Sequence, residues 1–255
     1  MKKLIKYVLI DILRNRFLIG YTACLLLLSF AVLSLDENSN KGLLSLLNLV
    51  LLLVPLVCLV FCTIYMYNSS VFIELLVSQP IRRKTIWLSF YIGLTTAFSL
   101  AWWIGAGVPV FFSTQGSAGW SLLLTGWLLS VIFVSIALLA SVISRDKARG
   151  IGISVLLWLY FSLLFDGLVL FLLFQFSDYP MEKPMLLFTA LNPIDLGRIL
   201  ILMEMDASAL MGYTGAVFKS FFGSSSGWLV SVTVMLAWAL IPLWISVRRF
   251  RKRDL

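Results

Sequence analysis

Six long apolar stretches divide this chain, and they constrain its fold more than any other feature of the sequence. Each is about 20 residues or longer, the length that an α-helix needs to cross the hydrocarbon core of a bilayer. In lipid, every backbone polar group needs a partner within the protein, so stretches of this length are expected to be helical. The stretches are residues 17–35, 43–67, 86–112, 119–144, 151–174 and 227–247.

The composition agrees with a membrane protein. Of the 255 residues, 61% are hydrophobic and only 13% are charged, whereas about 25% of the residues in soluble domains are charged. This balance excludes a water-soluble globular domain. The sequence therefore predicts an all-α integral membrane protein that forms a single transmembrane domain over residues 1–255.

Positive charge gathers in every second connecting segment. Most of the 20 Lys and Arg residues lie in the N-terminal segment, in residues 68–85, in residues 145–150 and after residue 247. Because such clusters are retained in the cytoplasm, they predict that both termini are cytoplasmic. The clusters are short and flank membrane spans, so the net charge of +8 does not indicate a nucleic-acid-binding surface.

Two cytoplasmic segments are predicted to be helical without crossing the membrane. Residues 2–16 carry apolar side chains at helical spacing on one face, which is typical of an interfacial helix at the membrane surface. Residues 72–80 form a second short helical stretch that ends at Pro80 and is followed by three cations. A short rigid helix in this place can transmit force from a cytoplasmic motor, but the pattern also fits a simple interfacial helix. The apolar face of the first helix comprises Ile5, Val8, Leu9 and Ile12.

The longest connecting segment, residues 175–226, is predicted to be extracytoplasmic and partly helical. Asn192 can cap a helix, and Pro193 suits the first helical position because that position needs no backbone N–H. Asp195 then lies in the first turn, three residues before Arg198, so that the two side chains can pair along the helix.

Groups for catalysis are scarce in this sequence. It contains no His, no phosphate-binding P-loop and no G-x-S-x-G nucleophile motif, so we expect no enzymatic activity. Asp166 is the one ionisable residue well inside a span, where a carboxylate is costly in lipid and is expected to face the bundle interior, a cavity or a partner. It is either a structural acid held by neighbouring hydroxyl groups or part of a conduit or proton relay.

Sulfur-containing residues are the candidate metal ligands. Cys58, Cys62 and Met66 follow one another at intervals of four residues and share a helix face, while Met203 and Met205 lie in the external segment. Thiolate and thioether ligands bind Cu(I), but Cys and Met also pack well in apolar cores. Both interpretations remain open, and no spacing here requires a metal.

Several segments resemble ABC-2 type permeases, the membrane subunits of ATP-driven transporters. Residues 74–80 (ELLVSQP), followed by Arg82, are similar to a segment of that family, and residues 13–17 (LRNRF) are similar to the end of its N-terminal elbow helix. Six spans with cytoplasmic termini agree with this family. The resemblance implies that residues 72–80 are a coupling helix that binds a separate ATPase. The implied coupling residues are Glu74, Leu75, Leu76, Gln79, Pro80 and Arg82.

Other segments resemble the permease subunit of transporters that serve maturation of nitrous oxide reductase. They are residues 144–152 (SRDKARGIG), 164–168 (LFDGL) and 191–199 (LNPIDLGRI). The resemblance implies two copies of the permease in a bacterial inner membrane, with two copies of a cytoplasmic ATPase that binds ATP and Mg. It also implies a periplasmic β-helical protein and a copper chaperone as partners, and no cofactor in this chain. Because an exposed Asp195–Arg198 pair stabilises its helix only slightly, we predict that this helix start docks the periplasmic protein, through Asn192, Pro193, Asp195 and Arg198.

Two other functions remain open at this stage. An ABC-2 permease of the same architecture can export another substrate, such as a drug, a lipid or a polysaccharide. A secondary transporter would work without an ATPase and would use Asp166 as a proton site, but it leaves the segment at 72–84 unexplained.

Overall fold

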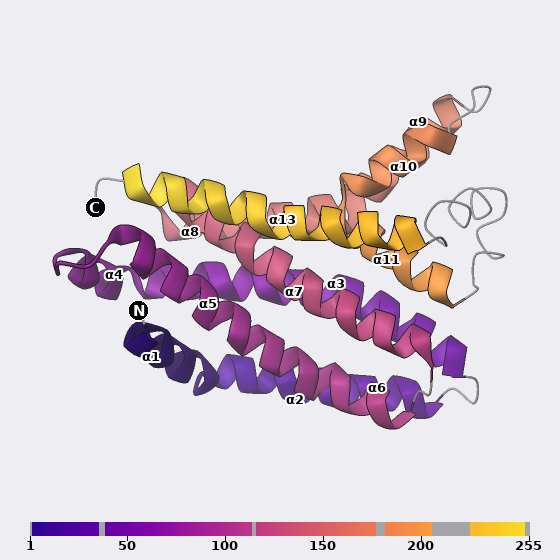
Figure 1. Cartoon of the computed structure of the whole chain (residues 1–255), viewed down its shortest axis with the longest axis horizontal. Coiled ribbons are helices and arrows are strands. Elements are labelled where there is room, and N and C mark those ends of the chain that lie inside the picture. The colour runs from indigo at the N-terminus through magenta and orange to yellow at the C-terminus, as the bar shows by residue number, and fades with distance from the viewer. Residues whose placement is uncertain (1, 36–38, 114–115, 177–181, 206–224, 253–255) are drawn as a thin grey trace.

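A computed structural model describes residues 2–35, 39–113, 116–176, 182–205 and 225–252, and the regular secondary structure in these ranges is entirely helical (Figure 1). It contains six helices that are long and apolar enough to cross a membrane. The prediction of an all-α protein with six spans is therefore confirmed. Each predicted span lies within a few residues of an observed helix.

The six spans differ in regularity. Two of them contain a π-helical turn in which the helix widens, namely η1 (Trp103–Gly107) in span three and η2 (Tyr160–Leu164) in span five. The spans are α2 (Arg16–Leu35), α3 (Ser39–Asn68), α5–η1–α6 (Arg83–Trp102 and Val108–Ser113 around η1), α7 (Ser117–Ile143), α8–η2–α9 (Lys147–Leu159 and Phe165–Gln175 around η2) and α13 (Ser225–Lys252). The shorter helices are α1 (Lys2–Leu13), α4 (Ser70–Val77), α10 (Glu182–Ala190) and α11 (Pro193–Glu204).

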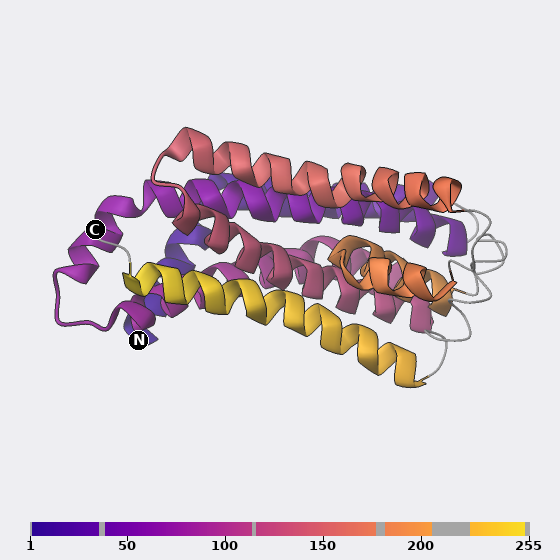
Figure 2. The same ribbon diagram turned by 90° about the horizontal axis from the view of Figure 1, so that it is seen from above.

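Helix α7 is the centre of the bundle. It packs against α3, α5, α11 and α13, and 78% of the residues in its most apolar 18-residue stretch are buried. The fifth span is the least buried of the six, with only 11% of the residues in its most apolar 18-residue stretch buried. Seen from above, α8 and α9 run along one edge of the bundle and α13 runs along the other (Figure 2). Most of the apolar surface of span five therefore faces away from this chain.

One end of the bundle holds α1, α4 and the last turns of α13, and we call it the termini end; the other is the far end (Figure 1). At the termini end, α1 packs along α5, where Val8 lies against Gly93. Val8 and Ile12 are fully buried, and the Tyr65 hydroxyl donates to Asp11 Oδ2 at 2.8 Å. The apolar face predicted for residues 2–16 is thus the face that α1 buries; its position at the membrane surface remains a prediction.

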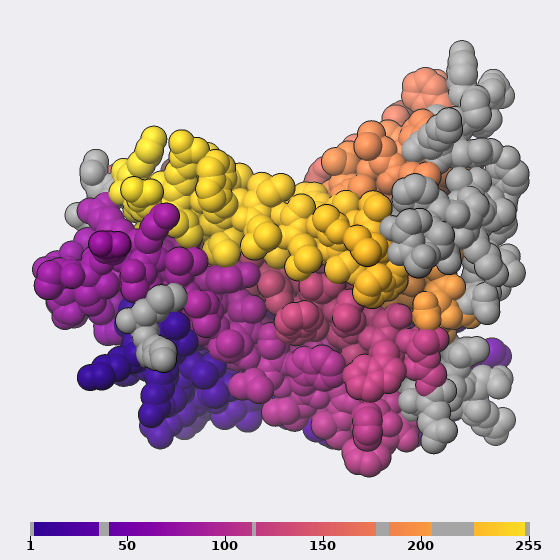
Figure 3. Space-filling model, in the orientation of Figure 1, coloured from indigo at the N-terminus to yellow at the C-terminus, as the bar shows by residue number. Residues whose placement is uncertain are grey.

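At the far end, the chain turns back into the bundle. Residues 184–190 and 193–204 meet at a bend of 113°, and α11 packs against α7, α13 and α3. Pro193, Ile194 and Leu196 are buried by this packing. The surface is hollowed between α13 and α10, which leans away from the bundle (Figures 1 and 3). The predicted external helix exists, but it is covered by the spans instead of lying free outside them.

A glycine allows α5 and α7 to approach each other closely. The indole ring of Trp102 is fully buried, and its Nε1 donates to the Leu123 carbonyl at 2.9 Å. The ring lies directly over Gly126, where a Cβ atom would overlap the ring carbons. The position therefore requires glycine because the large, hydrogen-bonded ring has no space to move into.

We expect Gly126→Ala to destabilise the protein because the added methyl group overlaps Trp102. Overpacking of this kind costs about 1–3 kcal/mol, so the variant is expected to unfold several degrees below the wild type in thermal denaturation in detergent. Gly167→Ala is the matched control, since a Cβ atom at that position meets no atom within 4 Å. Equal melting temperatures for the two variants would contradict this packing.

Candidate functional site

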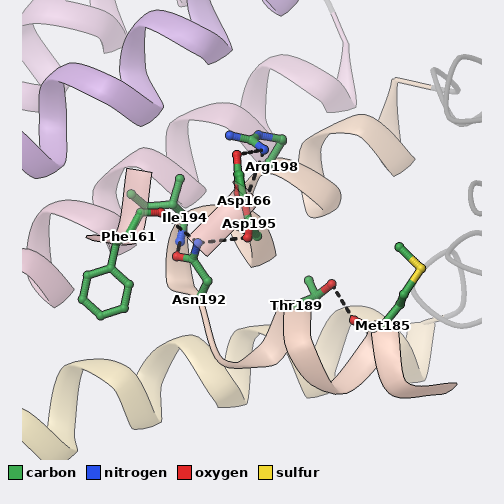
Figure 4. Close-up of polar contacts among 8 residues, drawn as sticks. All are labelled: Phe161, Asp166, Met185, Thr189, Asn192, Ile194, Asp195 and Arg198. Atoms are coloured by element: carbon green, nitrogen blue, oxygen red, sulfur yellow. Dashed lines mark hydrogen bonds and ion pairs between the residues drawn. The ribbon is translucent and has the colours of Figure 1, made fainter. Parts of the chain in front are cut away.

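Four polar side chains meet at the far end, where α9 and α11 lie together (Figure 4). Arg198 donates from a terminal guanidinium nitrogen to Asp166 Oδ2 at 2.9 Å, and the same nitrogen lies 3.3 Å from Asp195 Oδ1. The Asn192 amide donates to Asp195 Oδ2 at 2.9 Å. We call Asp166, Asn192, Asp195 and Arg198 the far-end cluster. It links the fifth span to the helix that re-enters the bundle.

The local sequence explains how α11 begins within this cluster. Asn192 Oδ1 accepts from the backbone N–H of Ile194 at 3.0 Å, and Pro193 occupies the first helical position without leaving an N–H unpaired. The Asn192 amide also donates to the carbonyl of Phe161 at 2.9 Å, within the widened turn η2. Both expectations for this helix start, the Asn192 cap and the Pro193 position, are confirmed. The bond to Phe161 was not foreseen because nothing in the sequence marks η2.

The far-end cluster carries two carboxylates and one guanidinium. The side chains of Asp166 and Arg198 are about one third exposed, at 33% and 34%, whereas Asp195 is 14% exposed. Asp195 Oδ1 is buried and has no hydrogen bond, so its attraction to Arg198 is that of an ion pair with unfavourable hydrogen-bond geometry. The sequence suggested hydroxyl groups as partners of Asp166; the structure pairs it with a cation, which offsets the cost of a carboxylate within a span.

The residues predicted to dock a periplasmic protein are partly covered by the bundle, and their docking role stays a prediction. Asn192 is fully buried, Pro193 is buried, and Asp195 and Arg198 turn toward α9. The predicted pairing of Asp195 with Arg198 along the helix is confirmed, at 3.3 Å, but α11 is enclosed by three spans instead of standing alone. A signal was present in the sequence: Ile194, Leu196, Ile199, Leu200 and Ile201 make α11 apolar on several faces, as expected for a buried helix.

A cavity of about 280 Å³ adjoins the far-end cluster. Its walls include Val169, Leu170 and Leu173 of α9 together with Met185 of α10, and the charged groups of Asp166, Asp195 and Arg198 line it. The Thr189 hydroxyl, also in the lining, is satisfied by the Met185 carbonyl at 2.9 Å (Figure 4). The charged groups are therefore reachable from a largely apolar recess.

The predicted coupling residues lie at the termini end, on and after α4. Leu75 is 60% exposed and Glu74 is exposed, but Leu76 is buried at 7%. Gln79, Pro80 and Arg82 follow the helix on the surface. Leu76 is therefore unavailable to a partner, and among the leucines of α4 only Leu75 faces outward. The sequence could not separate them because two adjacent leucines satisfy an apolar face equally well.

Aromatic contacts hold α4 against the bundle. Phe72 packs edge-on against Phe90 of α5, with ring centroids 6.3 Å apart, and against Tyr7 of α1 at 5.4 Å. Ile73 is buried on the same side as Leu76. The helix ends at Val77, and the Ser78 hydroxyl donates back to the Leu75 carbonyl at 2.9 Å. Packed aromatic rings thus join α4 to both α1 and α5.

The sulfur-containing candidates lie within the packed core. Cys58, Cys62 and Met66 of α3 are buried, as is Met205 at the end of α11, while Met203 is partly buried. Within the part of the chain that the structure describes, no three His, Cys, Asp or Glu residues lie close enough together to hold a metal ion. The described positions of these residues fit packing in the core, and their binding of copper stays a prediction.

Comparison with known proteins gives the class of this fold. Residues 73–255 match the family described as ABC-2 family transporter protein, so the chain belongs to the ABC-2 transporter family. It is a permease, the non-catalytic multi-pass transmembrane subunit of an ABC transporter. The chain is also similar to the probable ABC transporter permease protein NosY of Pseudomonas aeruginosa. The two are 27% identical over 278 aligned positions, which cover 97% of this chain and 96% of that protein. The resemblances seen in the sequence are therefore confirmed.

Removing the cation of the far-end cluster is expected to cost more than removing one acid. Arg198→Gln leaves Asp166 and Asp195 facing each other without a positive charge. We expect this change to lower the free energy of unfolding by about 1–3 kcal/mol. In Asp166→Asn, Arg198 keeps Asp195 as its partner, so we expect less than half of that loss. Thermal denaturation of both variants in the same detergent measures the order. A larger loss in Asp166→Asn would show that Arg198 does not hold the cluster together.

Proposed function

We propose that this chain is the permease of a NosY-type ABC transporter that serves maturation of the copper centre of nitrous oxide reductase. Two copies would pair in a bacterial inner membrane with two copies of an ATPase, which binds ATP and Mg. A periplasmic β-helical protein and a copper chaperone would complete the pathway. The observation that carries the proposal is the similarity to NosY, which extends over nearly the whole length of both chains.

Membership of the ABC-2 family bears on the alternatives. A permease of this family works with an ATPase, which favours ATP-driven transport over a secondary transporter that uses Asp166 as a proton site. The ion pair between Asp166 and Arg198 agrees with a structural role for this acid, because a nearby cation offsets the cost of a carboxylate within a span. An ABC-2 exporter of a drug, lipid or polysaccharide has the same architecture, and its partners distinguish it.

The geometry of α4 supports its proposed role as the coupling helix. Leu75 projects from the termini end, while Phe72, Ile73 and Leu76 anchor the opposite side of the helix to the bundle. An ATPase that binds Leu75 in an apolar groove would therefore move α4 together with α5 and α1. Glu74 and Arg82 would lie at the edge of such a contact, where exposed charges contribute little to affinity.

Purification of the tagged chain from its native bacterium tests the proposed function. We expect an ABC ATPase to co-purify in mild detergent, and a β-helical protein to be found among the proteins encoded beside it. A drug- or lipid-export operon in that place would reject the maturation role. Recovery of the chain without any ATPase would reject the transporter assignment as a whole.

Leu75→Ser is expected to weaken binding of the co-purified ATPase by about tenfold to a hundredfold, the loss from one buried apolar side chain. Leu76 is not a suitable test, because its replacement would disturb the core. Leu240→Ser is the control, since this leucine is similarly exposed at 59% and lies on α13, away from α4. Titration of the purified ATPase against both variants measures the effect. Equal affinities would remove α4 from the contact.

The orientation of the spans is tested by labelling with a membrane-impermeant thiol reagent in whole cells. Ser117→Cys lies at the start of α7 at the far end and is expected to react from outside. Lys84→Cys lies near the start of α5 at the termini end and is expected to react only after the cells are opened. Cys24 is replaced by Ser in both variants, because it is exposed, whereas Cys58 and Cys62 are buried. Labelling of Lys84→Cys in intact cells would reverse the topology.

A further inference from the structure

A groove of about 350 Å³ runs between α2 and span three on the outside of the bundle. Helices α1, α2 and α6 follow one another along one edge of the bundle (Figure 1). Only 22% of the residues in the most apolar 18-residue stretch of α2 are buried, so much of this helix faces outward. We call the space the α2 groove. Its lining comes from Leu13 at the end of α1, from α2 between Leu18 and Leu26, and from Leu100, Ala101 and Ile104 of span three.

The lining of the α2 groove is almost entirely apolar. Thr22 has the one polar side chain in this lining, and its hydroxyl already donates to the Leu18 carbonyl at 2.8 Å. Ile19, Leu100 and Ile104 are large apolar side chains, yet each is about half exposed, at 56%, 45% and 49%. Such a surface offers an occupant no free hydrogen-bonding group. It therefore suits a hydrocarbon chain.

The two helices that form the α2 groove are fixed to each other beneath it. Gly105 and Leu25 are buried there, and a Cβ atom at Gly105 would come within 2.8 Å of Leu25 Cβ. The rings of Tyr21 and Phe98 also pack together, with centroids 5.8 Å apart. These contacts hold α2 and span three in place, so the groove between them is a stable feature of the fold.

The length of the α2 groove corresponds to one leaflet of a bilayer. An α-helix rises about 1.5 Å per residue, so α2 extends about 15 Å from Arg16 to Leu26. This is half of a hydrocarbon core that is about 30 Å thick. The groove begins at Leu13, beside the start of α2, and ends near the middle of that span. One acyl chain of the leaflet at the termini end would therefore lie along it.

Positive charge stands at the end of the α2 groove where a lipid headgroup would lie. Arg14 directly follows Leu13, Arg16 is the first residue of α2, and both side chains are exposed. Within the described ranges, neither arginine forms an ion pair with a carboxylate. The nearest carboxylate along the chain is Asp11, which accepts from the Tyr65 hydroxyl at 2.8 Å. Residues 11–16 thus carry two cations against one carboxylate.

We propose that the α2 groove binds one anionic phospholipid, with its headgroup at Arg14 and Arg16 and one acyl chain along the groove. The position of the groove identifies the occupant, because it lies on the outer face of a membrane span and extends over one leaflet. Cations beside a membrane surface attract acidic phospholipids. A helix of a second copy in the groove would leave the two arginines without a partner. The inference depends on neither the ATPase nor the substrate, so it stands apart from the proposed function.

A lipid in the α2 groove would connect three elements of the bundle. It would contact the end of α1 at Leu13, one face of α2, and span three at Leu100 and Ile104. Helix α1 packs along α5 as well. A ligand that binds only the folded state stabilises it. We therefore expect an anionic phospholipid to raise the melting temperature of the protein more than a zwitterionic one does.

The pair of changes Arg14→Gln and Arg16→Gln tests the headgroup end. The control is Arg249→Gln with Arg251→Gln, two arginines of the same spacing that are exposed in the last turns of α13 and do not line the groove. The full chain in mild nonionic detergent is titrated with phosphatidylglycerol or phosphatidylcholine of equal chain length, and bound lipid is counted by native mass spectrometry. We expect the wild type to bind one phosphatidylglycerol about tenfold more tightly than phosphatidylcholine. The first pair of changes is expected to abolish this preference, and the control pair to alter it less than about twofold.

Ala23→Trp tests the groove itself, with Cys24→Trp as the matched control. Ala23 lines the α2 groove, whereas Cys24 is the next residue of the same helix, is exposed and does not line it. A tryptophan ring at position 23 would occupy the space of the acyl chain and remove its packing contacts. We expect Ala23→Trp to weaken phosphatidylglycerol binding at least about fivefold, and Cys24→Trp to change it less than about twofold.

The outcomes of these titrations separate the possible occupants. Wild-type affinity for phosphatidylglycerol in Ala23→Trp would overturn the lipid site. If that variant also lost a dimer that the wild type forms, the groove would be assigned to a second copy. An unchanged preference for phosphatidylglycerol in the variant that lacks Arg14 and Arg16 would overturn the anionic headgroup site. Each of these results would leave the proposed function standing.

Discussion

The close approach of three helices at Thr125 and Gly126 of α7 sets the arrangement of the whole bundle. On one side the buried Trp102 ring of α5 lies over Gly126; on the other, Gly197 of α11 lies against Thr125, where a Cβ atom would come within 2.8 Å of the methyl group. Two glycines thus bring α5 and α11 against one level of α7. Arg198 follows Gly197 directly, so this contact also places the guanidinium that pairs with Asp166. The packing that holds α11 against α7 therefore also positions the far-end cluster.

The two ends of the molecule are joined by the same helices. Helices α7 and α13 pack along each other, and α5 packs against both. At the termini end, α13 and α5 are held together by Trp87 and Phe250; at the far end, α7 and α13 enclose α11. Helix α7 is regular along its length, whereas spans three and five contain a widened turn and α13 contains Pro242, and each of these is a place where a helix is able to bend. The central helix is therefore the stiffest element of the bundle.

Much of the fold could be predicted because each feature depended on local sequence. The spans follow from the length of the apolar stretches. The start of α11 follows from Asn192, which caps a helix, and from Pro193, which suits the first helical position. The same local patterns did not show that Leu76 faces inward or that Arg198 reaches across to Asp166, because both depend on which helix lies next to them.

The widened turn η2 fixes the rotational register of the fifth span. Converting it to a regular α-helix would change the number of residues per turn and rotate the following helix by about 100°, the angle that one residue subtends. Asp166 is the second residue of that following helix, so the rotation would carry its carboxylate away from Arg198. Asn192 bonds to a carbonyl inside the same turn and would oppose the change. The widened turn and the ion pair between Asp166 and Arg198 therefore depend on each other.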